Sequence, residues 1–175
     1  EGPKHKRREI RIPQFFPDQI VQWSILLQTI PIFMEGMDPF CCGSVLGRGT
    51  SYAERYIRRW FQSDPRGTRY CLKLDIHHFY QSVDHDRLKA MLRRKFKDAE
   101  LLALLDLIID SVPTGLPIGN VTSQWFGNFY LQGLDHFARE QLHVRRYLRN
   151  MDDIVVFGPN KRKLGKAEAA IIKYL

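Results

Sequence analysis

Alternation of apolar and polar residues predicts strands in two parts of the chain. In residues 69–75, Tyr70, Leu72 and Leu74 alternate with more polar positions, which is the period of a half-buried strand. In residues 144–158, two apolar runs rich in β-branched residues flank a short polar centre. This second pattern predicts a β-hairpin with its turn at the polar centre.

Apolar residues at helical spacing predict helices through most of the remaining chain. The first is expected to be capped by Asp18 and to end near Pro31. The core positions expected in it are Ile20, Val21, Leu27 and Ile30. Further helices are expected at about residues 53–61, 85–96, 99–110, 122–141 and 161–175.

Shorter patterns complete the expected secondary structure. Ile10 and Ile12 alternate with charged residues and predict a short strand in the basic N-terminal segment. An apolar stripe that ends at Trp60 and Phe61 indicates helix packing. Thr122 or Ser123 is expected to cap the helix that follows. In the last helix, Ala167, Ala170, Ile171 and Leu175 are expected to face inward.

Three aspartates stand where these predicted strands end or turn. Asp152 and Asp153 are adjacent at the turn of the hairpin, and Asp75 follows the upstream strand. Aspartate tolerates turn geometry, which is one explanation of the pair. The other is that the turn directs oxygen ligands at a hard cation such as Mg²⁺. If the two strands are neighbours, the three carboxylates form the arrangement that two-metal phosphoryl transfer requires.

Three segments, in this order along the chain, resemble motifs of the reverse transcriptases. Residues 75–82 resemble the first catalytic motif of the palm. Residues 115–131 resemble the motif that positions the template-primer and the nucleotide. The segment Asn150-Met-Asp-Asp153 resembles the aromatic-x-Asp-Asp box. The nearest resemblance is to the bacterial and phage enzymes of diversity-generating retroelements, group II introns and retrons.

The resemblance implies an α+β fold of the right-hand polymerase type. A small antiparallel palm sheet backed by helices is expected, with fingers at residues 1–65 and palm at residues 66–175. Residues 86–120 are expected to pack back toward the fingers. No thumb is expected within the chain.

The resemblance also implies roles for the acidic residues. Asp75 and Asp152 would hold two Mg²⁺ ions, for which Mn²⁺ can substitute, together with the backbone of Ile76. Asp153 would be a supporting metal ligand. Tyr80 would lie under the sugar and exclude a ribose 2′-hydroxyl by steric clash.

Nucleotide contacts are expected from two further places. Arg8 aligns with an arginine of the fingers that clamps the triphosphate, and a shifted register would give that role to Arg7 or Arg11. Ile118 and Gly119 would lie beside the nascent base pair. Most reverse transcriptases have Gln-Gly here, and the Ile-Gly variant resembles the diversity-generating enzymes, which miscopy template adenines.

Template and primer contacts are expected from residues on several segments. Arg48, between two glycines, would contact the template backbone, unless its loop is an ordinary turn. Ser123 and Gln124 would contact the template, and the family usually has Ser-Pro at these two positions. Asn150 and Met151 would contact the primer end, although the family usually has Tyr or Phe in place of Asn150.

Composition agrees with a nucleic-acid partner. The 175 residues carry a net charge of +8, which favours a polyanion. No run of 18 apolar residues occurs, so no membrane span is expected. The three cysteines form no Cys-x-x-Cys pair, and a reducing cytoplasm is expected.

The sequence therefore predicts an RNA-directed DNA polymerase that adds dNTPs to a primer. Its expected partners are an RNA template with a DNA primer, or an RNA–DNA hybrid, and an accessory protein is left open. The alternatives are a group II intron-type or phage-defence enzyme, and a palm module that binds RNA without polymerising.

Overall fold

Three antiparallel strands form the sheet on which the other elements are arranged. The computed structural model describes residues 10 and 12–175. Strands β1 (Tyr70–Asp75), β2 (Arg146–Asn150) and β3 (Asp153–Gly158) lie in the order β1-β3-β2. The strand predicted upstream and the predicted hairpin are both confirmed, and the two are neighbours in the sheet.

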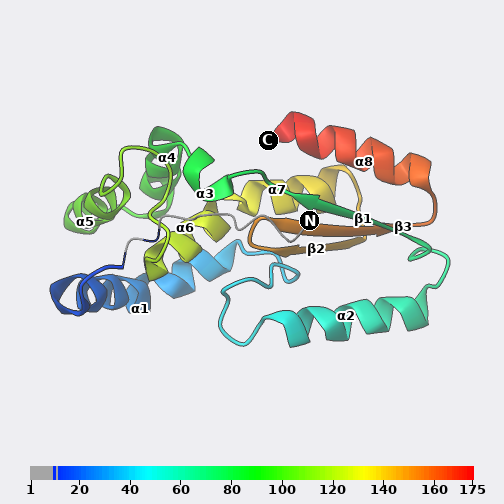
Figure 1. Cartoon of the computed structure of the whole chain (residues 1–175), viewed down its shortest axis with the longest axis horizontal. Coiled ribbons are helices and arrows are strands. Elements are labelled where there is room, and N and C mark those ends of the chain that lie inside the picture. The colour runs from blue at the N-terminus through cyan, green and yellow to red at the C-terminus, as the bar shows by residue number, and fades with distance from the viewer. Residues whose placement is uncertain (1–9, 11) are drawn as a thin grey trace, which may run out of the picture.

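Helices lie on both sides of the sheet and beyond one end of it (Figure 1). Helix α8 runs along one side and α2 along the other, while α1, α4, α5 and α6 gather beyond the hairpin turn. The helices are α1 (Ile20–Glu35), α2 (Thr50–Ser63), α3 (Phe79–Ser82), α4 (His85–Lys95), α5 (Ala99–Ile109), α6 (Val121–Tyr130), α7 (Gln132–His136) and α8 (Lys161–Tyr174). This is the predicted mixture of helices and a small antiparallel sheet.

The larger hydrophobic core joins the N-terminal helix to the three-stranded sheet. Phe33 of α1 is fully buried, and its ring centroid lies 5.5 Å from Phe96 and 5.2 Å from Phe129. The same core continues to Tyr147 and Ile154 of the sheet. The predicted fingers and palm therefore share one core, and residue 96 packs on α1; the boundary at residue 65 stays a prediction.

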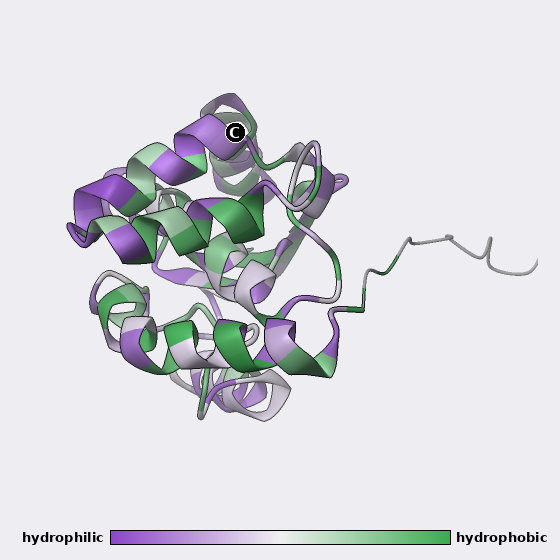
Figure 2. Ribbon diagram, turned by 90° about the vertical axis from the view of Figure 1, so that its left-hand side faces the viewer, coloured by the Kyte–Doolittle hydropathy of each residue, from purple (hydrophilic) through white to green (hydrophobic). Residues whose placement is uncertain are grey.

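A smaller core lies between α2 and the opposite face of the sheet. Trp60 packs with Cys42 and Leu148, and the rings of Phe61 and Phe157 meet edge to face at 5.3 Å. The apolar stripe of this helix is thus a packing surface, as predicted, although Phe61 at its end stays 47% exposed. Coloured by hydropathy, the helices carry hydrophobic residues on part of their surface and hydrophilic residues on the rest (Figure 2).

Helix α1 differs from the prediction in its ends and in its buried face. It passes through Pro31 to Glu35, and Asp18 accepts a hydrogen bond from the backbone of Gln14 and does not cap the helix. The residues that it buries are Gln22, Ile25, Leu26, Thr29 and Phe33. Of the predicted stripe, Ile30 packs against the core, whereas Ile20, Val21 and Leu27 are exposed. Polar Gln22 and Thr29 lie inside in their place.

Both of these buried polar residues have hydrogen-bond partners. The hydroxyl of Thr29 donates to the Ile25 carbonyl at 2.9 Å, and Gln22 accepts from the Thr122 hydroxyl at 3.3 Å. Burial of a polar group is tolerated when it is hydrogen-bonded. A hydrophobicity pattern does not register such pairs, which is why it selected the wrong face.

Three smaller predictions also need correction. Ile10 and Ile12 are not in a strand and are exposed, so their alternation does not reflect burial. The helix predicted over residues 122–141 is divided into α6, α7 and a π-helical turn (Phe137–Gln141). The N-cap residue of α6 is Asn120, and its side chain makes no capping hydrogen bond. Leu175, expected to face inward, is exposed.

In the part of the chain that the structure describes, no helix is long and apolar enough to cross a membrane.

Replacing Phe33 with alanine should lower the free energy of unfolding by about 3–5 kcal/mol, because a large buried ring is replaced by a cavity. Urea denaturation followed by circular dichroism measures this. Leu27→Ala on the same helix is the control: its side chain is 72% exposed, and a change within about 0.5 kcal/mol is expected. Equal effects of the two substitutions would contradict the burial assigned to α1.

Candidate active site

The three predicted acidic residues lie together at one end of the sheet. Asp75, the last residue of β1, is the direct cross-strand partner of Asp153, the first residue of β3. Asp152 precedes it in the hairpin turn, and its carbonyl accepts a hydrogen bond from the Ile76 N–H at 3.2 Å. Residues 75 and 152–153, far apart in sequence, are therefore neighbours.

Asp75 and Asp153 lie on the same face of the sheet. Cross-strand partners have their Cβ atoms about 5 Å apart, and like charges directly opposite each other are destabilising. A cation relieves this repulsion: Lys73 Nζ lies 3.1 Å from the Asp153 carboxylate, with the two side chains 67% and 45% exposed. The pair is exposed to solvent, so it holds Asp153 only weakly.

The donor chemistry of this end of the sheet fits Mg²⁺. Within the described residues, no three His, Cys, Asp or Glu side chains form a ready-made metal cluster. Mg²⁺ sites of phosphoryl-transfer enzymes need only one or two carboxylates, with water and substrate phosphates as the other ligands. Asp75 and Asp152 can supply these carboxylates, and Asp153 can join them once Lys73 releases it.

Tyr80 lies next to these acids. Burial, and secondarily the charge of Asp152, raise the pKa of the Tyr80 hydroxyl to about 12. The phenol therefore stays neutral at physiological pH, which suits the predicted role of a ring that packs under a sugar. Behind Tyr80 stands Gly115, with φ of +71°, where any Cβ would come within 2.6 Å of the Gln81 Cα.

The loop that precedes α6 is fastened to this part of the site. Leu116 N–H donates to the Tyr80 carbonyl at 2.7 Å, and His85 Nε2 bonds the Gly115 carbonyl at 2.5 Å. Farther along the loop, Ile118 is half-buried and Gly119 is exposed. Their predicted contact with the nascent base pair stays a prediction.

The predicted template contacts are placed unequally. Gln124 is exposed, whereas Ser123 is buried and its hydroxyl donates to the Pro117 carbonyl at 2.7 Å. Arg48 is half-buried and donates to the carbonyls of Asp38 and Cys41 at 2.8 and 3.0 Å. Ser123 and Arg48 thus hold their own loops, and these bonds compete with the predicted template contacts. Arg8 lies outside the described residues.

Arg149, which the sequence patterns did not single out, supports the hairpin from the side of the core. It is fully buried, and its Nε and Nη2 each donate to the Asp135 carboxylate at 2.7 Å. Its Nη1 donates to Asn128 Oδ1 at 3.0 Å and to the Met151 carbonyl at 2.9 Å. The last bond fixes the turn that carries Asp152.

The groups around this ion pair are also buried. Burial alone would lower the pKa of Arg149, but the charge and hydrogen bonds of Asp135 outweigh it and raise that pKa above its usual value. Tyr147 donates its hydroxyl to Asp135 at 2.7 Å. Burial raises the pKa of the Cys41 thiol to about 12, so this thiol is a neutral neighbour of Arg149.

The loop before α2 closes on the other side of the hairpin turn. Cys42 N–H donates to the Arg149 carbonyl at 2.8 Å, and Arg149 N–H donates to the Phe40 carbonyl at 3.0 Å. At Gly43, a Cβ would lie 2.6 Å from the Met151 backbone nitrogen, so only glycine fits. Met151 and the exposed Asn150 therefore lie against this loop; their predicted primer contacts stay predictions.

These features define a fold of helices around a small antiparallel sheet that solved structures share. No protein-family model matches the chain, and a comparison with curated proteins gives no match. The fold is nevertheless similar to that of solved structures of telomerase. One is telomerase from Candida albicans in complex with the TWJ fragment of telomeric RNA (TM-score 0.60, 12% identity).

A second is apo telomerase from Candida tropicalis, truncated from the C-terminal domain (TM-score 0.57, 15% identity). The matches cover 89% and 93% of this chain, but only 32% and 41% of the telomerase chains. The chain thus spans less than half of either protein. At these identities, the comparison establishes the shared fold.

Replacing Arg149 with methionine should cost about 3–5 kcal/mol of stability, because it leaves the Asp135 carboxylate buried without its cation. Combining it with Asp135→Asn should cost less than the sum of the two single changes, by about 2 kcal/mol. A double-mutant cycle by urea denaturation measures both. As a control, Arg58→Met breaks an exposed pair with Glu54 and should change stability by less than about 1 kcal/mol. Strict additivity at 135 and 149 would refute the coupling.

Proposed function

We propose that the chain is an RNA-directed DNA polymerase that adds dNTPs to a primer 3′-hydroxyl. The observation that carries the proposal is the cross-strand pairing of Asp75 with Asp153, with Asp152 in the adjoining turn. Carboxylates side by side at an exposed end of a sheet suit the binding of metal ions, and bound metal ions would in turn hold the nucleotide phosphates. The telomerase-like fold and the net charge of +8 also support it.

In this proposal, Asp75 and Asp152 hold two Mg²⁺ ions and Asp153 is a supporting ligand. The bound metal would activate the 3′-hydroxyl and stabilise the charge that develops on the leaving pyrophosphate. Tyr80 packs against the sugar of the incoming nucleotide and leaves no room for a 2′-hydroxyl. The RNA–DNA duplex is gripped through its backbone and 2′-hydroxyls rather than its base edges.

We also propose that the enzyme belongs with those of bacterial or phage retroelements of the diversity-generating type. Support comes from Ile118 and Gly119 before α6, together with Gln124 after Ser123. A half-buried Ile118 offers the nascent base pair no hydrogen-bonding side chain, which suits relaxed base selection. A group II intron-type or phage-defence enzyme would share the same acids, and sequencing of products copied from a defined RNA separates these possibilities.

One observation favours a second function, that of a palm that holds RNA without polymerising. Asn150, whose cross-strand partner is Asp153, occupies a position where the resemblance leads us to expect an aromatic ring. Loss of this ring would remove a packing surface for the primer end. Primer extension on poly(rA)·oligo(dT) with Mg²⁺ distinguishes the two functions.

Replacing Asp75 with asparagine should lower the rate of primer extension roughly 10²–10⁴-fold, because a metal ligand is lost. The affinity for RNA should change little. Single-turnover extension and RNA titration, performed on the same preparation, measure the two quantities separately.

Asp86→Asn is the matched control for this test, since Asp86 is an exposed aspartate in the first turn of α4. It should extend primers at the parental rate. If Asp75→Asn also extends at the parental rate, the metal role of Asp75 is wrong. If the parent itself does not extend primers but binds RNA, the non-polymerising palm is the function.

Replacing Tyr80 with alanine should raise the incorporation of ribonucleotides relative to deoxyribonucleotides about 10–100-fold, because the ring that excludes the 2′-hydroxyl is gone. The ratio of kcat/KM for rATP and dATP on a poly(rU) template primed with oligo(dA) measures it. Tyr80→Phe keeps the ring and should keep the parental ratio. The same ratio in all three proteins would remove Tyr80 from sugar selection.

A further inference from the structure

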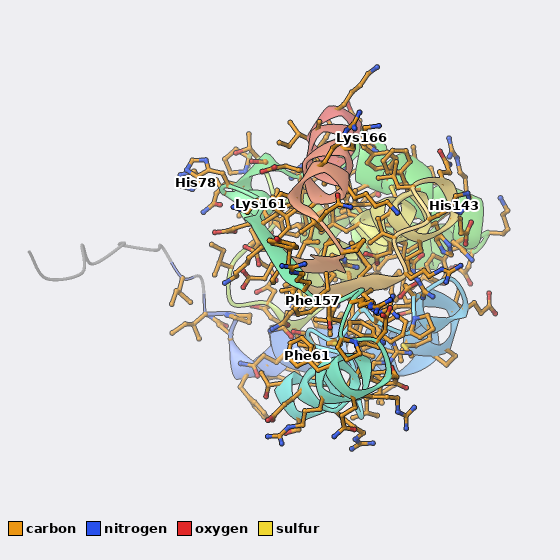
Figure 3. All side chains as sticks on the ribbon, turned by 90° about the vertical axis from the view of Figure 1, so that its right-hand side faces the viewer. Phe61, His78, His143, Phe157, Lys161 and Lys166 are labelled. Carbon is orange, nitrogen blue, oxygen red and sulfur yellow. The ribbon has the colours of Figure 1, made fainter. Side chains whose placement is uncertain are left out.

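A cavity of about 710 Å³ opens at the end of the sheet opposite the aspartates. Its walls are the turn before β1, the start of β2, the end of β3 and the first turns of α8. Figure 3 looks onto this end of the molecule, with Lys161 and Lys166 on α8, His143 to one side, and Phe157 above Phe61. A cavity of this size accommodates a ligand of one or two nucleotide units.

The lining of the cavity is strongly cationic. Five basic side chains line it, against one carboxylate, that of Asp64. They are Arg66, Arg145, Arg146, Lys163 and Lys166. Asp64 is already paired with Arg146, so the remaining four cations have no acid among the lining residues. Such an excess of one sign within a concave surface attracts anions.

Two local features indicate a ligand-binding site at this end of the sheet. Among the described residues, Arg146 Nε is the one buried side-chain nitrogen or oxygen atom without a hydrogen-bond partner. His143, on the rim, has a left-handed backbone with φ of 52°, a conformation that is strained for residues other than glycine. An unbonded buried nitrogen on the half-buried Arg146 and a strained loop beside it together indicate a ligand site.

Apolar residues form the rest of the lining. Val144, Val156, Phe157 and Leu164 contribute to it between the cations. A surface that combines apolar and cationic groups suits the bases and phosphates of a nucleic-acid strand, since bases stack on apolar or aromatic groups while phosphates take the cations. An acidic peptide would use the cations but would leave much of the apolar lining unused.

The cavity is separate from the candidate active site. Tyr70 pairs with Gly158 at the cavity end of β1 and β3, and Asp75 pairs with Asp153 at the other end. A six-residue strand separates the ends by about 17 Å. A ligand in the cavity therefore cannot be the nucleotide that reacts at the aspartates.

We propose that this cavity binds a second, single-stranded segment of RNA, through phosphates held by Arg145, Lys163 and Lys166. The inference rests on the proposed function for the identity of the polyanion. It adds an anchoring site, so that RNA would be held at both ends of the same sheet. Binding here would be electrostatic and independent of sequence.

The test measures the affinity for a fluorescein-labelled 15-nucleotide oligouridylate by fluorescence anisotropy, with the parent and with Lys163→Glu/Lys166→Glu. The variant should bind about tenfold or more weakly, and its salt dependence should be less steep by about 1.4 in log–log slope, for two lost phosphate contacts. Photo-crosslinking of 4-thiouridine RNA to the parent should label residues 142–146 or 161–167.

Arg94→Glu/Lys97→Glu is the matched control, because it makes the same change in net charge at exposed positions around the end of α4, away from the cavity. It should bind within about twofold of the parent, and circular dichroism should show that both variants are folded. Equal weakening by the two variants would reduce the effect to overall charge and overturn the cavity as a site. Selective loss of an acidic 15-residue peptide with unchanged RNA affinity would assign the cavity to a protein partner instead.

The two proposals can fail separately. The cavity variant should still extend a short preformed duplex at saturating concentration, because its aspartates are intact. Asp75→Asn should still give the cavity crosslinks, because its cations are intact. A chain without polymerase activity but with these crosslinks would refute only the proposed function, and extension without them would refute only the cavity site.

Discussion

The structure of the candidate site depends on one buried interaction, the ion pair between Arg149 and Asp135. Both side chains have no exposed surface, and the guanidinium is bonded on every side by Asp135, Asn128, Cys41 and the Met151 carbonyl. A buried ion pair contributes little net stability over a hydrophobic pair of the same volume, but breaking it is costly. Its effect here is therefore on specificity: one register of the hairpin satisfies all of these groups.

That register decides whether the carboxylates meet. The side-chain period of a strand is two residues, so a slip of one position would turn Asp153 to the other face of the sheet. Arg149 opposes the slip by bonding the Met151 carbonyl of the turn, and the absence of a side chain at Gly43 leaves space for Met151. The end of the sheet that carries the three aspartates is thus supported from the core side by neutral and ion-paired groups. Its other side stays open to solvent. Among the described residues, Lys73 is the cation paired with these acids, and a metal or a substrate can displace so exposed a cation.

Much of this arrangement could be predicted from local patterns. The period of two predicted both strand regions. The helical period predicted α4, α5 and α8 nearly to the residue, and α2 without its first three and last two residues. The convergence of Asp75 on Asp153 required the family resemblance, since no pattern in a single chain states which strands are neighbours. Arg149 shares its strand face with Tyr147, so its burial could have been inferred from parity. Its partner Asp135, on another element, could not have been found in that way.

The prediction of the buried face was wrong for α1 and right for α2, and both outcomes have the same physical cause. A helix that packs through apolar residues alone reveals its face in the sequence, as Trp60 and its neighbours do. Helix α1 buries Gln22 and Thr29 because each finds a partner, one of them 100 residues away. Whether a polar residue is buried depends on its hydrogen-bond partners. A hydrophobicity pattern therefore predicts least well the surfaces that are made of polar residues, and functional sites are such surfaces. The same holds at both ends of the sheet. The aspartates at one end and the basic residues at the other form sites only because the fold brings them together, and a pattern along the sequence does not show this.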